Sequence, residues 1–139
     1  MNPRDWPGVK TAYGTCAMPT APLERAFAEL GRLGYDGGEI CISDRHIGAT
    51  PEQMDGARRR TPAACLGDNA LEVPALLIMG HLYHGDAAGV GDTMERLRVC
   101  AQLARDLGVG DEPVLAVGFG GRASDWRTIR DRMAEQLGE

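Results

Sequence analysis

This chain lacks several features that would mark it for a membrane, for export or for nucleic acid. Its longest apolar run, residues 73–79, is far shorter than the roughly 20 residues that cross a bilayer, so we expect no membrane partner. The N-terminal stretch MNPRDWPGVK has no apolar segment of the kind that signal peptides carry. The net charge of −5 gives no basic surface for nucleic acid. These features together predict a cytoplasmic protein.

The cysteines also lack a pattern that would give them a joint role. The four, Cys16, Cys41, Cys65 and Cys100, include no CxxC pair, which argues against a zinc knot. Free thiols in a cytoplasmic protein are therefore expected. Cys41 and Cys100 are interpreted as core residues, because no histidine or other base lies beside them in sequence to activate a thiolate.

The length of 139 residues fits one domain with a core of its own. Residues 1–8 are polar, contain two prolines and are expected to form a frayed lead-in, which leaves residues 9–139 as the folded domain. Four segments have the composition of strands: residues 9–15, 35–42, 71–79 and 114–119. The last of these is apolar throughout, as in parallel sheets that are covered on both faces.

The segments between these strands carry helical signals. In the first, Pro22 fits the opening turn and Gly34 supplies the stop. In the second, Thr50 and Gln53 resemble a capping box, and Pro62 is predicted to end or kink the helix.

The third and fourth helices have clearer apolar stripes. Asp92 is expected to cap the third, which ends at Gly108 and carries Met94, Leu97, Ala101, Ala104 and Leu107 on one face. Asp125 is expected to cap the fourth, whose apolar residues are Trp126, Ile129, Met133 and Leu137.

The chain is therefore predicted to be an α/β protein with four consecutive βα units. Strands separated by helices pair in parallel through right-handed crossovers. In such folds ligands bind at the carboxyl ends of the strands. A complete small flavodoxin-like sheet, which binds its ligand at a switch point, is the alternative arrangement.

Four stretches of the sequence carry a family resemblance: AYGTCAMP, PLERAFAELGRLGYDGGEICI, LEVPALLIMGHLYHGD and ERLRVCAQLARDLGV. Together they resemble the sugar phosphate isomerase/epimerase family, whose members are xylose isomerase-like TIM barrels. The most specific piece is LGRLGYDGGEI, residues 30–40, and the resemblance extends over residues 9–137. Since a TIM barrel has eight βα units and this chain has four, the resemblance implies the N-terminal half of a (β/α)8 barrel.

The resemblance also implies a reaction and a set of partners. Family members move a proton next to the carbonyl of a small sugar or sugar phosphate, with a divalent metal such as Mn, Mg, Co or Zn. Because the family holds that metal mainly on strands five to eight, no metal ligand is assigned in this chain. Completion would come from a missing C-terminal half or from a second copy in a homodimer, since four parallel strands leave two open edges.

Two residues are the candidates for catalysis by this resemblance. Glu39 lies in the second strand, where a buried carboxylate is costly unless it is paired. A structural ion pair with an arginine is its alternative role. His84 follows the third strand, and its imidazole could bind a metal or a sugar oxygen. A hydrogen bond to the backbone or to Asp86 is the alternative for His84.

His81, Asp86 and His46 are candidates for substrate binding. His81 adjoins the apolar third strand, and His46 lies in a polar loop that we expect to be solvated. All three histidines follow the second and third strands, on the side where a barrel has its active face. Glu39 and His84 are accordingly predicted to lie at the same end of the sheet.

Two further motifs have simpler interpretations. The GFGG of residues 118–121 lacks the lysine of a phosphate loop and the spacing of a dinucleotide fingerprint, so a tight turn is favoured. The run Arg58–Arg60 is interpreted as a solvated helix face. A non-catalytic half-barrel that only assembles, or that binds a small ligand, is the alternative function.

Overall fold

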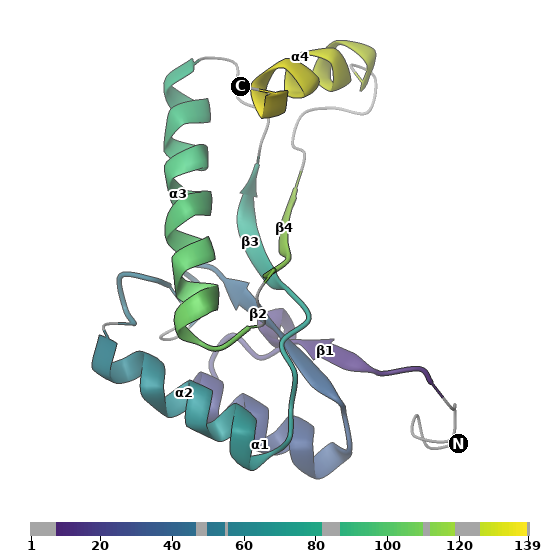
Figure 1. Cartoon of the computed structure of the whole chain (residues 1–139), viewed down its shortest axis with the longest axis vertical. Coiled ribbons are helices and arrows are strands. Elements are labelled where there is room, and N and C mark those ends of the chain that lie inside the picture. The colour runs from purple at the N-terminus through teal and green to yellow at the C-terminus, as the bar shows by residue number, and fades with distance from the viewer. Residues whose placement is uncertain are drawn as a thin grey trace.

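The computed structural model describes residues 8–46, 50–54, 56–81, 87–109, 112–118 and 126–138. Strands and helices alternate along the chain (Figure 1). They are β1 (Ala12–Gly14), the short 3-10 helix η2 (Thr15–Ala17), α1 (Leu23–Leu33), β2 (Gly37–Ile42), α2 (Gly56–Asp68), β3 (Leu76–His81), α3 (Ala87–Asp106), β4 (Leu115–Gly118) and α4 (Trp126–Gly138). None of the described helices combines the length and apolar character needed to cross a membrane. The predicted α/β class is confirmed.

The four strands form one parallel sheet in the order β1-β2-β3-β4. Because each strand pairs with the next one in sequence, crossovers of the usual right hand place α1, α2 and α3 on the same face of the sheet. Figure 1 shows these three helices on that face. The order of the four described strands never reverses, so this part of the chain contains no switch point of the flavodoxin-like kind.

The core lies between this face of the sheet and the three helices. Helix α1 contributes Leu23, Phe27 and Leu30, at the predicted helical spacing. It ends at Gly34, whose φ of 88° is the left-handed conformation that glycine adopts readily, and whose N–H donates to the Leu30 carbonyl. The sheet contributes Ile40, Ile42, Leu76 and Ile78, and α3 contributes Cys100, Leu103 and Ala104.

Helix α2 differs from the sequence-based expectation at both of its signals. Thr50 and Gln53 form a turn that precedes the helix, so the predicted capping box is wrong. The helix then continues through Pro62 to Asp68, so of the two predicted effects of that proline the end of the helix is wrong, and the kink stays a prediction. The Pro62 ring and Leu66 are buried where α2 packs on α1, and this burial offsets the backbone hydrogen bond that proline cannot make.

The arginines of α2 are not all solvated, contrary to the interpretation of Arg58–Arg60 as a solvated helix face. Arg59 donates to the Met54 carbonyl over 2.8 Å and forms a salt bridge with Asp106 at the end of α3. The pKa of the Asp106 carboxyl is lowered first by its hydrogen bond from Gln102 and then by the bond from Arg59. The ion pair joins α2 to α3, whereas Arg60 is exposed as expected.

Helix α3 begins at Ala87, well before Asp92. The prediction that Asp92 caps this helix is therefore wrong, and the residue lies inside it. Two alanines open the helix, and their high helix propensity favours the earlier start. The far end is as predicted, because Gly108 adopts a φ of 74° just after the last turn.

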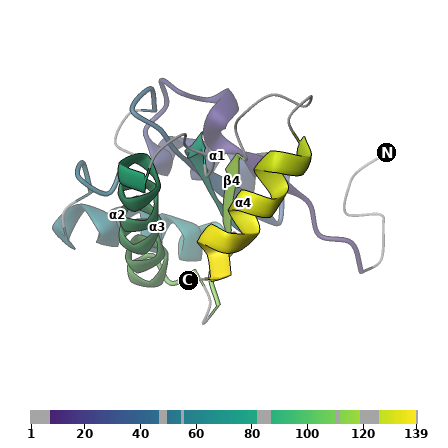
Figure 2. The same cartoon turned by 90° about the horizontal axis from the view of Figure 1, so that it is seen from above.

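Helix α4 is placed differently from the other three. In Figures 1 and 2 it lies across the carboxyl-terminal ends of β3 and β4 instead of alongside the sheet. Ile129 and Met133 are buried, whereas Trp126, the first residue of the helix, is 49% exposed. The expected capping residue, Asp125, lies outside the described part of the chain.

The second face of the sheet is the one that α1, α2 and α3 leave uncovered. A Cβ at Gly38 would meet Leu30 and Phe27, so this residue faces α1. Side chains alternate along a strand, and Glu39 therefore projects from the opposite face. By the same alternation and the pairing register, that face carries Gly14, Glu39, Cys41, Leu77 and Met79. We call these five residues the open face.

Candidate functional site

Glu39 is the predicted catalytic residue that the structure places most clearly. Its Oε2 atom lies 3.1 Å from the position that a Cβ would take on Gly14, the residue with which it pairs in register. The side chain is half-buried, and in the described ranges it has no salt-bridge partner. The alternative role for Glu39, a structural ion pair with an arginine, therefore finds no support there.

Two cysteines lie near this carboxylate, and a buried threonine joins the segments that carry them. Thr15 is fully buried, and its Oγ1 accepts a 2.9 Å hydrogen bond from the Cys41 N–H, which ties η2 to β2. The Cys16 Sγ lies 3.3 Å from the same Cβ position on Gly14 that Glu39 approaches. Burial raises the pKa of the Cys41 thiol, and Cys16 and Glu39 raise it further. All four cysteines are free, as expected, and Cys41 and Cys100 are buried.

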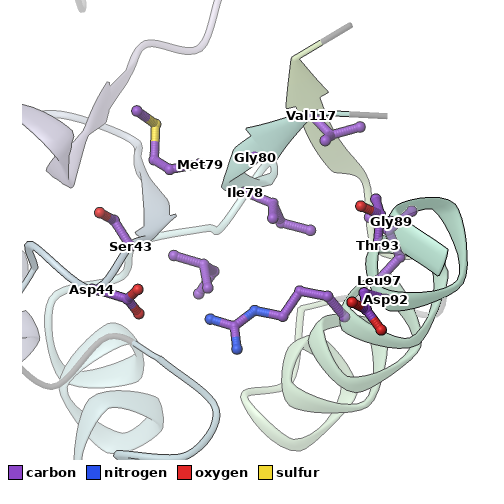
Figure 3. A pocket seen from close by; sticks show the side chains of 12 residues that line it. Ser43, Asp44, Ile78, Met79, Gly80, Gly89, Asp92, Thr93, Leu97 and Val117 are labelled. Carbon is purple, nitrogen blue, oxygen red and sulfur yellow. The ribbon is translucent and has the colours of Figure 1, made fainter. Parts of the chain in front are cut away.

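A cavity of about 400 Å³ lies at the carboxyl-terminal ends of β2 and β3, beside the first half of α3 (Figure 3). Ile42 and Ile78 in its wall belong to the core on the helix-covered side of the sheet, and Met79 of the open face also lines the cavity. Its volume falls within the range of small-molecule sites. Its polar lining consists of Ser43, Asp44, Asp92, Thr93 and Arg96.

The charges in this cavity come from both of its walls. Figure 3 shows Asp44 on one side and Asp92 on the helix opposite. Arg96 donates to Glu52 over 2.5 Å, which places its guanidinium at the rim. The pKa of the Glu52 carboxyl is lowered first by its own backbone N–H, and also by Thr50 and Arg96. Carboxylates, hydroxyls and a guanidinium together can bind a ligand rich in hydroxyl groups.

The sequence pattern did not single out this set of residues. Asp92 and Arg96 are four residues apart, and that spacing on a helix places two side chains on one face. The signal was hidden because Asp92 was predicted to cap the helix instead of lying within it. Asp44 directly follows a strand, the position where chemistry gathers in α/β folds, but no residue near it in sequence indicated a partner.

The predicted substrate-binding residues have different outcomes. His46 is 1% exposed, so the expectation that it is solvated is wrong. Its backbone N–H donates to the Ser43 carbonyl in a turn, and this turn carries the imidazole inward. His81 is the last residue of β3 and pairs with Gly118 after an irregularity in the register, but its side chain is outside the described set. His84 and Asp86 lie outside the described residues, so the shared end of Glu39 and His84 stays a prediction.

The buried imidazole of His46 leads to a stability prediction. Neither ring nitrogen has a hydrogen-bond partner among the described residues. Since a buried unsatisfied polar group costs about 1–3 kcal/mol, His46→Leu is expected to raise the free energy of unfolding by about that amount. Urea denaturation followed by circular dichroism measures the change.

Thr15→Val is the matched control for this substitution. It removes a buried polar atom that is bonded, and it leaves the Cys41 N–H without its acceptor. Thr15→Val is therefore expected to lower the free energy of unfolding by about 1–3 kcal/mol, the opposite of the effect expected for His46→Leu. A clear loss of stability in His46→Leu would contradict the prediction, because it would show that the ring makes a bond that stabilises the fold.

The divalent metal implied by the family resemblance has no site in the described part of the chain. There, no three side chains of His, Cys, Asp or Glu come together in a way that could hold a metal ion. The side chains of His81, His84 and Asp86 lie outside that part.

Comparison of the sequence with models of known protein families gives no match, and comparison with curated proteins also gives none. The resemblance to sugar phosphate isomerases and epimerases accordingly rests on the quoted sequence stretches.

Proposed function

We propose that this chain is the N-terminal half of a sugar or sugar-phosphate isomerase or epimerase, with Glu39 facing the substrate. The observation that carries the proposal is the position of a carboxylate that has no salt-bridge partner among the described residues, on the open face of a sheet with sequential strand order. In a closed eight-stranded barrel, the face opposite the helices becomes the interior. Glu39 would then project inward from the second strand.

The chemistry that suits Glu39 is proton transfer. An ionised carboxylate can take a proton from the carbon next to a carbonyl and return it to a neighbouring carbon or to the other side of the same carbon. The first outcome is isomerisation and the second is epimerisation. Partial burial beside Cys41 reduces the water around the carboxylate, which strengthens its interactions with a bound substrate. A divalent metal, as the resemblance implies, would need ligands from the other half of the barrel.

Completion of the site requires a partner, because β1 and β4 are the two edges of the described sheet. Large apolar side chains are exposed close to both edges: Val9 and Tyr13 near β1, and Val114 near β4. Unpaired strand edges with exposed apolar groups favour association. The partner is a second copy of this chain or a C-terminal half with four further βα units.

The cavity favours a second candidate function. A half-barrel that binds a small polyhydroxylated ligand without catalysis would use Asp44, Asp92 and Arg96, which line a space of ligand size. This function does not need Glu39, because that residue does not line the cavity. The two candidates therefore predict different contact residues.

An NMR titration of the isotope-labelled chain with triose and hexose phosphates, in the presence of Mg²⁺, separates these functions. We expect the largest amide shifts at Gly14, Glu39 and Cys41. Glu39→Gln should weaken binding about tenfold or more, since a hydrogen bond to a charged group is worth about 1.5–3 kcal/mol. Glu95→Gln is the matched control, because Glu95 is an exposed residue of α3 paired with Arg98.

Three results would contradict the proposed isomerase half. Shifts confined to Asp44, Asp92 and Arg96 would support the binding function instead. Equal affinity of Glu39→Gln and the unchanged chain would remove Glu39 from the site. No shift with any sugar phosphate at millimolar concentration would exclude both functions.

A further inference from the structure

We propose that Cys16 and Cys41 form a reversible disulfide across the open face when the protein meets a peroxide. Nothing in the sequence pairs these residues, because they are distant along the chain and share no motif. The structure brings them to the carboxyl-terminal end of the β1-β2 pair, next to Glu39.

The register of the two strands sets the positions of the cysteines. Gly14, two residues before Cys16, pairs with Glu39, two residues before Cys41, so both cysteines follow the last paired residues of β1 and β2 at the same end of the sheet. The Cys16 Sγ lies 3.3 Å from the same Cβ position on Gly14 that the Glu39 Oε2 approaches to 3.1 Å, so the Cys16 sulfur is on the open face, from which Cys41 also projects. The chain turns into η2 at Thr15, but the hydrogen bond from the Cys41 N–H to Thr15 Oγ1 keeps this turn against β2.

The two thiols differ in exposure, and each has a separate role. Cys16 is exposed, and its Sγ bends back over Gly14, where it donates a weak 3.9 Å hydrogen bond to the Gly14 carbonyl. Cys41 is buried and projects from the same face as Glu39. The influence of Cys16 on the pKa of the Cys41 thiol is consistent with this proximity. Rotation about the Cys16 Cα–Cβ bond is the movement that would turn its sulfur toward Cys41.

The chemistry balances with hydrogen peroxide as the named oxidant. The exposed Cys16 thiolate attacks one peroxide oxygen, the O–O bond breaks, and a sulfenic acid and hydroxide form. The Cys41 sulfur then attacks the Cys16 sulfur, and the S–O bond breaks with release of water. In total two thiols lose two hydrogen atoms and one peroxide becomes two waters. A thiol reductant restores both cysteines.

The disulfide would lie beside Glu39 and fix η2 on β2. Oxidation would therefore alter the surface on which the proposed substrate site depends. The pairing itself does not rest on that proposed function, because it follows from register, exposure and thiol chemistry alone.

Peptide mapping by mass spectrometry after peroxide treatment tests the pairing in the full chain. Free thiols are alkylated under denaturing conditions before digestion. We expect a peptide pair linked through Cys16 and Cys41, with Cys100 alkylated, and we expect a thiol reductant to remove the link. Cys65→Ser, the control, should form the same link, whereas Cys41→Ser should stop at a Cys16 sulfenic acid that a dione probe captures.

Other products would overturn the inference. Cys41 fully alkylated after peroxide, with Cys16 carried on to sulfinic acid, would show that the sulfurs do not meet. A disulfide between the Cys16 residues of two molecules, with no internal disulfide, would also show that the Cys16 and Cys41 sulfurs do not meet. Circular dichroism of each variant confirms that it is folded before these results are compared.

Discussion

Replacement of Phe27 by alanine is expected to lower the free energy of unfolding by about 3–5 kcal/mol. Phe27 is 0% exposed and packs in the core between α1 and β2, where its ring lies 3.4 Å from the position that a Cβ would take on Gly38. Truncation removes a large buried apolar surface and leaves a cavity that a sheet backbone cannot readily fill. Since domains of this kind are stable by about 5–15 kcal/mol, the loss takes a large share of the total.

Leu33→Ala is the matched control in the same helix. Leu33 is 53% exposed and buries little surface, so we expect a change of about 0.5 kcal/mol or less. Urea denaturation followed by circular dichroism measures both variants. Equal effects for Phe27 and Leu33 would contradict the packing of α1 against the sheet, because the helix would then present a different face to the core.

Gly37→Ala is expected to have the second-largest effect, a loss of about 1–3 kcal/mol or more. A Cβ at Gly37 would lie 2.6 Å from the Glu72 carbonyl oxygen, a backbone atom that cannot move as a flexible side chain can. The Gly38 N–H donates to that same carbonyl over 2.9 Å, so a displacement of Glu72 also disturbs this bond. The sheet needs glycine here because β2 and the segment before β3 approach closely.

Gly91→Ala is the control for this substitution. Gly91 is exposed within α3, and nothing lies within 4 Å of the Cβ that alanine would add. We expect a gain of about 0.5–1 kcal/mol, because alanine has less conformational freedom to lose in a helix. If Gly37→Ala were as stable as the unchanged protein in the same denaturation experiment, the bridge between Gly37 and Glu72 would be incorrect.

Helix α1 shows how much of the fold local sequence can specify. Its apolar spacing and the glycine stop at Gly34 are both local, and both are confirmed. The start of β3 is a different case, because the predicted strand began at Leu71 and the observed one begins at Leu76. Apolar composition alone cannot distinguish a buried segment that leads into a strand from the strand itself. Leu71 is buried and Glu72 forms only an isolated bridge, so the composition was strand-like before the regular pairing began.

The start of α3 and the continuity of α2 were both mispredicted, because local sequence signals pointed to other helix boundaries. Asp92 and Glu95 resemble a capping box, but α3 is already formed at that point. Pro62 resembles a break, yet its burial in α2 outweighs the lost hydrogen bond. In the case of Pro62 tertiary packing decides the outcome, and a single sequence carries little information about packing.

The sequence predicted where in the fold the candidate site lies better than it predicted which residues form it. The place of Glu39 within a strand followed from the sequence. That no described arginine pairs with it depends on where each of those side chains lies in three dimensions. The polar composition of the loop after β2 predicted that His46 is solvated. In the structure the turn that starts at Ser43 carries His46 into a buried position. The cavity beside α3 could not be predicted from the sequence, because it is formed where that helix meets the ends of two strands.

The native mass of the purified chain, measured by size exclusion with light scattering, tests the half-barrel most directly. We expect association, with two copies as the smallest assembly that can pair both edges and cover the open face, where Met79 is 62% exposed. Glu39 from each copy would then face a shared interior. A single monomeric species at tens of micromolar, with no binding of a hydrophobic dye, would contradict the half-barrel, because its edges and open face would then need no partner.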